Sequence, residues 1–331
     1  MVNIMLYGIR EEELSMVKAW SLRNGVRVDY TELNLTAETV TLAKGYDGVT
    51  ISQVAELDLS LYDTLASYGI KQIAQRSAGF EMHDLNEASK HGLIISNVPS
   101  YSPESIAEFA VTAALNLVRK TELIQTKVAE QDFRWMSAIR ARVIQEMTVA
   151  VIGVGRIGSR VAKIYRGFGA RVLAYDIEPR PELADLVDYQ DSVEQAISQA
   201  DIVTLHMPAT ALNHHQFSLE LFKQFKPGAI LINTARGPIV KTEDLLAALD
   251  RGYLAEAFLD VYEGEAPYVP VDWRAREISD PILQRVLSHP KITYTPHIAF
   301  YTDTAVQNLI DIPLDATLEV IRTGDTKLRV N

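Results

Sequence analysis

The chain has 331 residues, of which 47% are apolar and 23% charged, and this composition is typical of a globular protein with about two domains. Its net charge of −11 argues against a partner that presents a phosphate backbone, so we expect no nucleic-acid partner. The absence of cysteine excludes disulfide bonds, thiolate catalysis and cysteine-ligated zinc.

The distribution of apolar residues bears on where the protein acts. The first apolar run is too short for a signal peptide, and acidic residues follow it at 11–13. No apolar run approaches the roughly 18–20 residues that a membrane span needs. We therefore expect a cytoplasmic protein with no membrane partner.

The first hundred residues alternate short apolar runs with amphipathic segments, which predicts an α/β unit with a parallel sheet. Strands are expected at 2–7, 26–30, 48–51, 70–74 and 93–96. Helices are expected at 11–23, 37–43, 59–67 and 83–90. We interpret His83 as an ordinary surface or helix-end residue.

A break in this alternation at 97–103 precedes a long helix. Ser102 can cap that helix and Pro103 can occupy its first position, and the helix is expected to run to about residue 130. A second series of strands, spaced by helices as in a dinucleotide-binding domain, is expected at 149–152, 171–175, 201–205, 229–233, 255–259 and 292–295. A last helix is expected at 303–322. The chain should cross between two domains near 97–103 and 297–303, with a cleft between them.

The most specific motif is GVGRIG at 153–158, which lies between an expected strand and an expected helix. In the dinucleotide fingerprint, Gly153 permits the tight turn, Gly155 lets a pyrophosphate approach the backbone, and Gly158 lets the helix pack closely. The N-terminus of the helix then faces the phosphates. Asp176 ends the next strand, where it can accept hydrogen bonds from an adenosine ribose and repel a 2′-phosphate. The motif therefore predicts NAD rather than NADP.

Polar groups follow three later strands, at the sheet edge where ligands of such domains bind. Arg236 could clamp a carboxylate and polarise a carbonyl, or it could be a surface arginine. The acidic loop 260–265 lacks the ligand spacing of a cation loop, so we expect no metal. His297 could be an ordinary loop histidine, but hydride transfer to a ketone needs a proton donor that works near neutral pH. Glu265 is the candidate partner for this histidine.

Taken together, these motifs resemble those of the NAD-dependent D-2-hydroxyacid dehydrogenase family. The resemblance rests on GVGRIG at 153–158, NTARGP at 233–238, DVYEGE at 260–265 and TPHIAFYTDTAV at 295–306. Within the family, the D-lactate and D-hydroxyisocaproate dehydrogenases of lactic acid bacteria are most similar, and they also share YGIR at 7–10 and SNVPSYSPESIAEFA at 96–110. The similarity spans essentially the whole chain.

The resemblance implies a Rossmann-type NAD-binding domain at 101–299 and a flavodoxin-like, discontinuous catalytic domain at 1–100 and 300–331. It implies a homodimer formed through the nucleotide domains, and it assigns catalysis to Arg236, Glu265 and His297. The implied cofactor contacts are Gly153, Gly155, Arg156, Ile157, Gly158, Asp176, Met207, Pro208, Asn213, Thr234, Ala235, Arg236 and Asp260. The implied substrate contacts are Ser52, Ser77, Ala78, Gly79, Tyr101 and Phe300.

The size of the substrate stays open. Many lactate-specific relatives carry a bulky aromatic residue where this chain has Ser52, and relatives usually read R-N-V-G where it reads RSAG at 76–79. Smaller side chains would admit larger 2-keto acids, although one methylene changes preference by only about 1–3 kcal/mol. The 260–265 loop and Trp135 resemble the lactate enzymes more closely. We therefore expect reversible hydride transfer between NADH and pyruvate to give D-lactate, with a broad enzyme for 2-ketoisocaproate or phenylpyruvate as the alternative.

Three other activities of the same fold are less consistent with these residues. A formate dehydrogenase would pair the histidine with glutamine, whereas this chain offers Glu265. A phosphoglycerate dehydrogenase would often carry an additional regulatory domain at its C-terminus. A corepressor that senses NAD would carry added segments for protein binding, which we do not find in this sequence.

Overall fold

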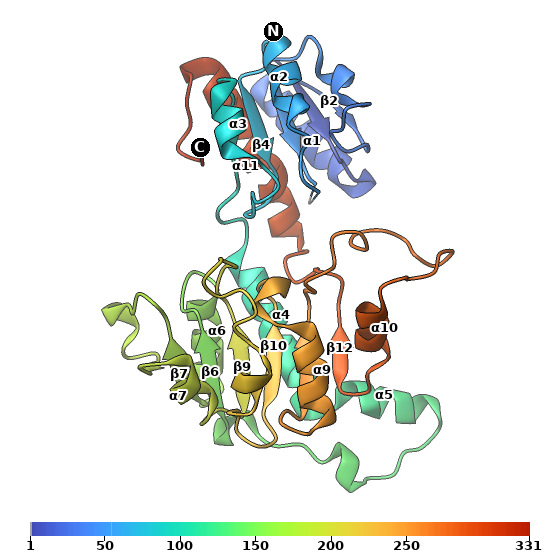
Figure 1. Ribbon diagram of the computed structural model, residues 1–331, viewed down its shortest axis with the longest axis vertical. Coiled ribbons are helices and arrows are strands. Elements are labelled where there is room, and N and C mark those ends of the chain that lie inside the picture. Colours follow the sequence, from blue (N-terminus) through green and yellow to red (C-terminus); the bar gives the residue numbers. More distant parts are fainter. Residues whose placement is uncertain (1, 54) are drawn as a thin grey trace. The chain divides into compact units, whose positions relative to one another are not determined.

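The computed structural model describes residues 2–53 and 55–331, and the chain divides into two compact units. Unit 1 consists of Met1–Ser102 and Tyr301–Asn331, and unit 2 consists of Pro103–Phe300. Each unit is built on a parallel sheet with helices, which confirms the predicted α/β fold class (Figure 1). Within the described residues, we find no helix with the length and apolar character that crossing a membrane requires.

The sheet of unit 1 has the strand order β2-β1-β3-β4-β5, which is the flavodoxin-like order of a doubly wound sheet. Its strands are β1 (Asn3–Tyr7), β2 (Arg27–Thr31), β3 (Gly48–Ile51), β4 (Gln72–Gln75) and β5 (Ile94–Ser96). Its α-helices are α1 (Leu14–Asn24), α2 (Ser60–Ser67), α3 (Leu85–Lys90) and α11 (Asp303–Thr323), and its 3-10 helices are η1 (Glu11–Glu13) and η2 (Val40–Ala43).

The C-terminal helix α11 is an integral part of unit 1, although the whole of unit 2 separates it from β5 in the sequence. It packs against β3 and β4 and against α1. The fully buried Trp20 of α1 donates a hydrogen bond from Nε1 to Oδ1 of Asp315 at 2.8 Å. A Cβ atom on Gly48 would lie only 2.3 Å from the Thr317 side chain, so glycine lets the helix lie directly on the sheet.

The sheet of unit 2 has the order β12-β11-β10-β9-β6-β7-β8. Its strands are β6 (Thr148–Ile152), β7 (Arg171–Tyr175), β8 (Asp188–Tyr189), β9 (Ile202–Leu205), β10 (Ile230–Asn233), β11 (Glu256–Leu259) and β12 (Ile292–Tyr294). Its α-helices are α4 (Pro103–Arg119), α5 (Thr121–Ala129), α6 (Gly158–Gly167), α7 (Val193–Ile197), α8 (Leu219–Phe222), α9 (Thr242–Asp250) and α10 (Pro281–Ser288). Its 3-10 helices are η3 (Ser137–Ile139), η4 (Ile144–Glu146), η5 (Pro181–Leu183) and η6 (Gly237–Ile239).

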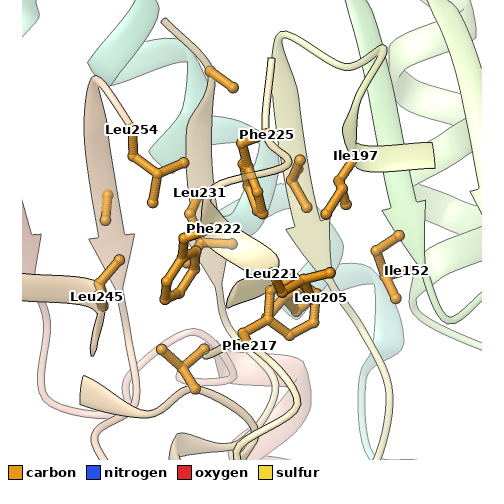
Figure 2. Close-up of a cluster of buried hydrophobic side chains, with 14 of the residues drawn as sticks. Ile152, Ile197, Leu205, Phe217, Leu221, Phe222, Phe225, Leu231, Leu245 and Leu254 are labelled. Carbon is orange, nitrogen blue, oxygen red and sulfur yellow. The ribbon is translucent and has the colours of Figure 1, made fainter. Parts of the chain in front are cut away.

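An aromatic cluster forms part of the core on one face of the unit 2 sheet. Figure 2 shows Phe217, Phe222 and Phe225 gathered beside Leu205 of β9 and Leu231 of β10. The ring centroids of Phe222 and Phe225 lie 5.7 Å apart. Each such buried side chain contributes about 1.5–3 kcal/mol to folding. This packing fixes β9 and β10, and the site residues follow the C-terminal ends of these strands.

The structure corrects two expected elements and adds one strand. The predicted helix from 103 to about 130 is two helices, because Lys120 adopts a left-handed backbone with φ +56° between α4 and α5. Its ammonium group bonds Glu256 at 2.6 Å and so ties this break to the start of β11. The expected helix at 37–43 is reduced to the 3-10 turn η2, and the two-residue strand β8 was not predicted.

Candidate active site

The glycine turn after β6 has the shape that a dinucleotide requires. Gly153 has φ +89°, and a Cβ atom there would lie 2.8 Å from the carbonyl carbon of His206. A Cβ atom on Gly158, the first residue of α6, would lie 1.9 Å from the Gly153 oxygen. A Cβ atom on Gly155 would meet nothing within 4 Å, so no internal packing demands glycine at this position. Close approach of an external group gives the reason for it, and the pyrophosphate of NAD fits that role.

The carboxylate of Asp176 is fixed beside this turn. Its Oδ2 accepts the Val154 N–H at 2.6 Å, and its Oδ1 accepts the Glu178 N–H at 3.0 Å. The Arg180 guanidinium donates to the carbonyl oxygens of Val154 and Gly155. Since a carboxylate offers about four lone-pair sites, Asp176 keeps capacity for a ribose hydroxyl.

The remaining expected cofactor contacts lie on short loops of unit 2. Ile157 packs partly buried against the core, and Arg156 is exposed in the turn before α6. The side chain of Asn213 folds its own loop, because its Oδ1 accepts the Thr210 N–H at 2.7 Å and its Nδ2 donates to the Pro208 oxygen at 2.8 Å. Met207 precedes this loop and packs partly buried against the core.

The turn that carries Arg236 is shaped by the buried Asn233 at the end of β10. The Asn233 amide accepts the Ala235 N–H at 3.0 Å and donates to the Arg236 oxygen at 3.1 Å. Thr234, which lies between Asn233 and Ala235 in the chain, is buried. The Arg236 guanidinium is half-buried and bonds the Ala235 carbonyl at 2.8 Å. A Cβ atom on Gly237 would lie 2.3 Å from the Tyr262 carbonyl carbon, so the backbone of this turn lies directly against the 260–265 loop.

His297 and Glu265 form a close pair, with 2.6 Å between Nδ1 and Oε1. The other carboxylate oxygen of Glu265 accepts the Tyr262 N–H at 2.9 Å, so both oxygens are oriented. His297 has φ +54°, a left-handed conformation that is uncommon for histidine. Within the described part of the chain its Nε2 has no hydrogen-bond partner, and the side chain is 35% exposed. Nε2 is therefore open to an external ligand.

Asp260 holds the loop that presents His297. The residue is fully buried, and its carboxylate accepts the Thr295 hydroxyl at 2.5 Å and the N–H groups of Ile298 and Ala299, each at 2.9 Å. Its carbonyl oxygen accepts the His297 N–H at 2.7 Å. This geometry makes Asp260 a positioning residue for the histidine loop.

A second histidine–glutamate pair lies beside the first and was not predicted from the sequence. His215 Nε2 and Glu263 Oε2 are 2.6 Å apart, and Glu263 Oε1 accepts the Thr242 N–H at 2.9 Å. Burial alone would raise the pKa of Glu263, but the hydrogen bonds from Thr242 and His215 outweigh it and lower that pKa. The motif DVYEGE contains this acid, yet no spacing rule could connect it to His215, 48 residues away.

In unit 1, the turn after β4 exposes a row of backbone N–H groups. Its three carbonyl oxygens all accept hydrogen bonds. The Ser77 oxygen accepts the Val98 N–H at 2.9 Å, and the Ala78 oxygen accepts the Asn97 side-chain amide at 2.7 Å. The Gly79 oxygen accepts the Ser77 hydroxyl at 2.7 Å. Across residues 2–53 and 55–331, no hydrogen bond engages the N–H groups of Ser77, Ala78 or Gly79. Consecutive N–H groups that are left open in this way suit an anion.

Other expected residues are placed as follows. Ser52 directly follows β3, and the Tyr101 carbonyl accepts a hydrogen bond from the Asn308 amide at 2.6 Å. Phe300 is the last residue of unit 2.

The interpretation of His83 as a surface residue is wrong, because it is only 7% exposed and lies beside β4 residue Gln75. No group of histidine and acidic side chains arranged to hold a metal ion occurs among the described residues.

Comparison with known proteins gives a consistent result. Residues 111–299 match the family model described as D-isomer specific 2-hydroxyacid dehydrogenase, NAD binding domain. A D-lactate dehydrogenase of Streptococcus agalactiae is 53% identical over 330 residues, with full coverage of both chains. The crystal structure of a D-lactate dehydrogenase from Treponema pallidum matches with a TM-score of 0.92 and 38% identity over 100% of both chains. A solved structure of a D-2-hydroxyisocaproate dehydrogenase matches with a TM-score of 0.92 and 34% identity over 99% of both chains.

The family model covers more than half of the chain, and the streptococcal relative covers all of it. The glycine turn, the histidine–glutamate pair and Arg236 lie in the matched residues 111–299. The chain belongs to the family of D-isomer specific 2-hydroxyacid dehydrogenases, and its second unit contains the NAD-binding domain of that family.

Proposed function

We propose that the protein is an NAD-dependent D-lactate dehydrogenase that interconverts pyruvate and D-lactate. The observation that carries this proposal is the pairing of His297 with Glu265 at 2.6 Å, with the histidine Nε2 open to a ligand. The names of relatives that match over the full chain support the choice of substrate.

The side chains then have distinct tasks. Bound NADH supplies the hydride. His297 donates the proton from Nε2 to the carbonyl oxygen, while Glu265 accepts the Nδ1 proton and so fixes the orientation of the ring. The Arg236 guanidinium stabilises the negative charge that develops on that oxygen. In the reverse direction, His297 accepts the proton of the hydroxyl group.

The cofactor is held, on this proposal, by the glycine turn 153–158 and by Asp176. Asp176 binds a ribose hydroxyl and disfavours a 2′-phosphate by charge repulsion, which selects NAD. Loop residues at the ends of β9 and β10 complete this binding site, namely Met207, Pro208, Asn213, Thr234 and Ala235.

Unit 1 serves, we propose, as the catalytic domain that binds the substrate. The N–H groups of the 77–79 turn bind the substrate carboxylate. The three carbonyl oxygens of the turn already accept hydrogen bonds, so the N–H groups are the polar backbone groups that the turn offers to a ligand. Ser52 and Tyr101 contact the rest of the substrate. A specific observation keeps a second candidate: Ser52 and Ala78 are small, and one structural relative is named a D-2-hydroxyisocaproate dehydrogenase. The alternative is an enzyme that prefers larger 2-keto acids.

One assay tests the proposal and separates the two candidates. NADH oxidation is followed by absorbance after addition of pyruvate, 2-ketoisocaproate or phenylpyruvate. We expect the highest kcat/KM with pyruvate. A higher value with either larger acid would favour the second candidate, and no oxidation with any of the three would refute both.

We also propose a homodimer in the cytoplasm. Apolar side chains that are exposed in the single chain concentrate between α5 and β6, including Phe133, Trp135 and Val143. Exposed apolar groups of this kind are typical of subunit contacts. Light scattering coupled to gel filtration should give twice the 36.9 kDa mass of the chain. Fractionation of cells tests the location.

A further inference from the structure

A chain of buried hydrogen bonds connects the two segments of unit 1 that we assign to the substrate. Its centre is Gln75, the last residue of β4, which is 1% exposed. The Gln75 Nε2 atom lies 2.9 Å from Ser77 Oγ and 3.3 Å from the Gln53 carbonyl oxygen. Its Oε1 atom lies 3.2 Å from His83 Nε2.

The direction of every bond in this chain follows from chemistry. A carbonyl oxygen only accepts, so the Gln75 atom that faces the Gln53 carbonyl is the amide nitrogen. The same nitrogen donates a hydrogen bond to the Ser77 hydroxyl oxygen. The Ser77 hydroxyl in turn donates its proton to the Gly79 carbonyl at 2.7 Å. That last bond engages the Gly79 carbonyl, while the N–H groups of the turn stay open.

His83 completes the chain at its other end. Because Gln75 Oε1 only accepts, His83 must carry a proton on Nε2. Burial lowers the pKa of His83 to about 4, so the ring is neutral at physiological pH. The neutral ring with its proton on Nε2 fixes the Gln75 amide in a single orientation.

The second donor bond of Gln75 reaches the segment that contains Ser52. Gln53 follows Ser52, and its own side chain accepts the Leu35 N–H at 2.9 Å. The Gln75 amide therefore fixes two backbone segments at once: 52–53 through the Gln53 carbonyl and 77–79 through the Ser77 hydroxyl.

We propose that Gln75 is a positioning residue that sets the spacing between the carboxylate turn 77–79 and Ser52, and thereby determines which 2-keto acid is preferred. This inference rests on the proposed function, since it takes the turn to bind the carboxylate and Ser52 to line the rest of the substrate. Gln75 itself touches no substrate. Ser77 transmits its effect to the turn.

Two variants separate the two arms of the chain. Ser77→Ala removes the hydroxyl and with it both of its bonds, the one to the Gly79 carbonyl and the one from Gln75, but it keeps the bond between Gln75 and the Gln53 carbonyl. We expect it to raise KM about tenfold for pyruvate, 2-ketoisocaproate and phenylpyruvate alike, because all three share the carboxylate. Gln75→Met keeps the length of the side chain but removes both donors. We expect it to raise every KM and also to change the ratio of kcat/KM between phenylpyruvate and pyruvate about fivefold or more, with NADH affinity unchanged.

Gln72→Met provides the matched control. Gln72 lies on the same strand, is equally buried and bonds a serine, Ser96 Oγ at 2.6 Å, but it lies away from the turn. A purely structural effect would lower the melting temperature of both glutamine variants and leave the substrate ranking intact.

The outcomes are distinct. If wild-type protein oxidises NADH with none of the three acids, the proposed function fails and this inference fails with it. If wild type is active and Gln75→Met matches Gln72→Met in KM and ranking, only the inference is overturned. Should Gln75→Met not fold, an unchanged KM in Ser77→Ala overturns it equally, and a uniform rise in KM supports the carboxylate arm.

Discussion

His215 and Glu263 form a second histidine–carboxylate pair, with 2.6 Å between His215 Nε2 and Glu263 Oε2. Glu263 lies two residues before Glu265 in the chain. The His215 N–H also bonds the Pro238 carbonyl at 2.8 Å, next to the turn that carries Arg236. The pair therefore holds the 260–265 loop to the segment that follows Arg236.

The first prediction concerns this pair. Glu263→Ala leaves the Thr242 N–H and the His215 ring without their partner, so we expect a loss of about 1–3 kcal/mol in the free energy of unfolding. We also expect kcat for pyruvate to fall, because the loop that carries Glu265 is released. Urea denaturation and steady-state kinetics measure the two effects. Glu277→Ala, at an exposed acid outside the helices and strands, is the control and should change neither quantity.

The second prediction concerns the role of Glu265. Glu265→Gln keeps an oxygen that can accept the Nδ1 proton of His297 but removes the negative charge beside the ring. We expect kcat for pyruvate reduction to fall by at least about tenfold with NADH affinity unchanged, because general acid catalysis contributes about 10²–10⁴-fold when the proton donor is positioned. An unchanged kcat would show that Glu265 is not the functional partner of His297. Glu277→Gln replaces an exposed acid and serves as the control.

A third prediction addresses the choice of cofactor. In Asp176→Ser the hydroxyl can still accept the Val154 N–H, but the charge that repels a 2′-phosphate is gone. Two like charges a few ångströms apart near a protein surface cost on the order of 4 kcal/mol. The ratio of kcat/KM for NADPH to that for NADH should therefore rise by at least about tenfold. An unchanged ratio would remove Asp176 from cofactor selection.

The secondary structure could be predicted where the pattern is local. Fully buried strands such as β3 and β9 are short segments of mostly apolar, β-branched residues, and the glycine motif marks its own strand, turn and helix. The break at Lys120 was not predicted, because a lysine with left-handed backbone leaves no sequence pattern and its ion-pair partner Glu256 lies 136 residues further along the chain. β8 is too short to leave a sequence pattern.

The same distinction applies to the candidate site. Arg236, Glu265 and His297 follow strands of a recognisable domain, so their place at one edge of the sheet could be predicted. His83 could not, because the sequence contains no signal that the segment after Gly79 buries a histidine against Gln75. The pairing of Glu263 with His215 joins two loops that come together only when β9 and β11 take their places beside β10.

The fourth prediction concerns stability in acid. Burial lowers the pKa of His83 from 6.5 to about 4. Above pH 6.5 the ring is neutral in both the folded and the unfolded chain. As the pH falls from 6.5 to 4, His83 binds a proton in the unfolded chain but stays largely neutral in the folded chain. The free energy of unfolding therefore decreases by about 3 kcal/mol. His83→Gln should lack this part of the decrease when urea denaturation at pH 7 and pH 4 is compared, and an equal decrease in both proteins would contradict it.

The central claim is that His297 delivers the proton to the substrate carbonyl. The most direct measurement is the rate of NADH oxidation with pyruvate in wild type and in His297→Gln, with NADH affinity determined by fluorescence titration. We expect kcat to fall about 10²–10⁴-fold in the variant while NADH affinity is unchanged, because general acid catalysis contributes a factor of that size. Near-wild-type turnover in His297→Gln would contradict the account.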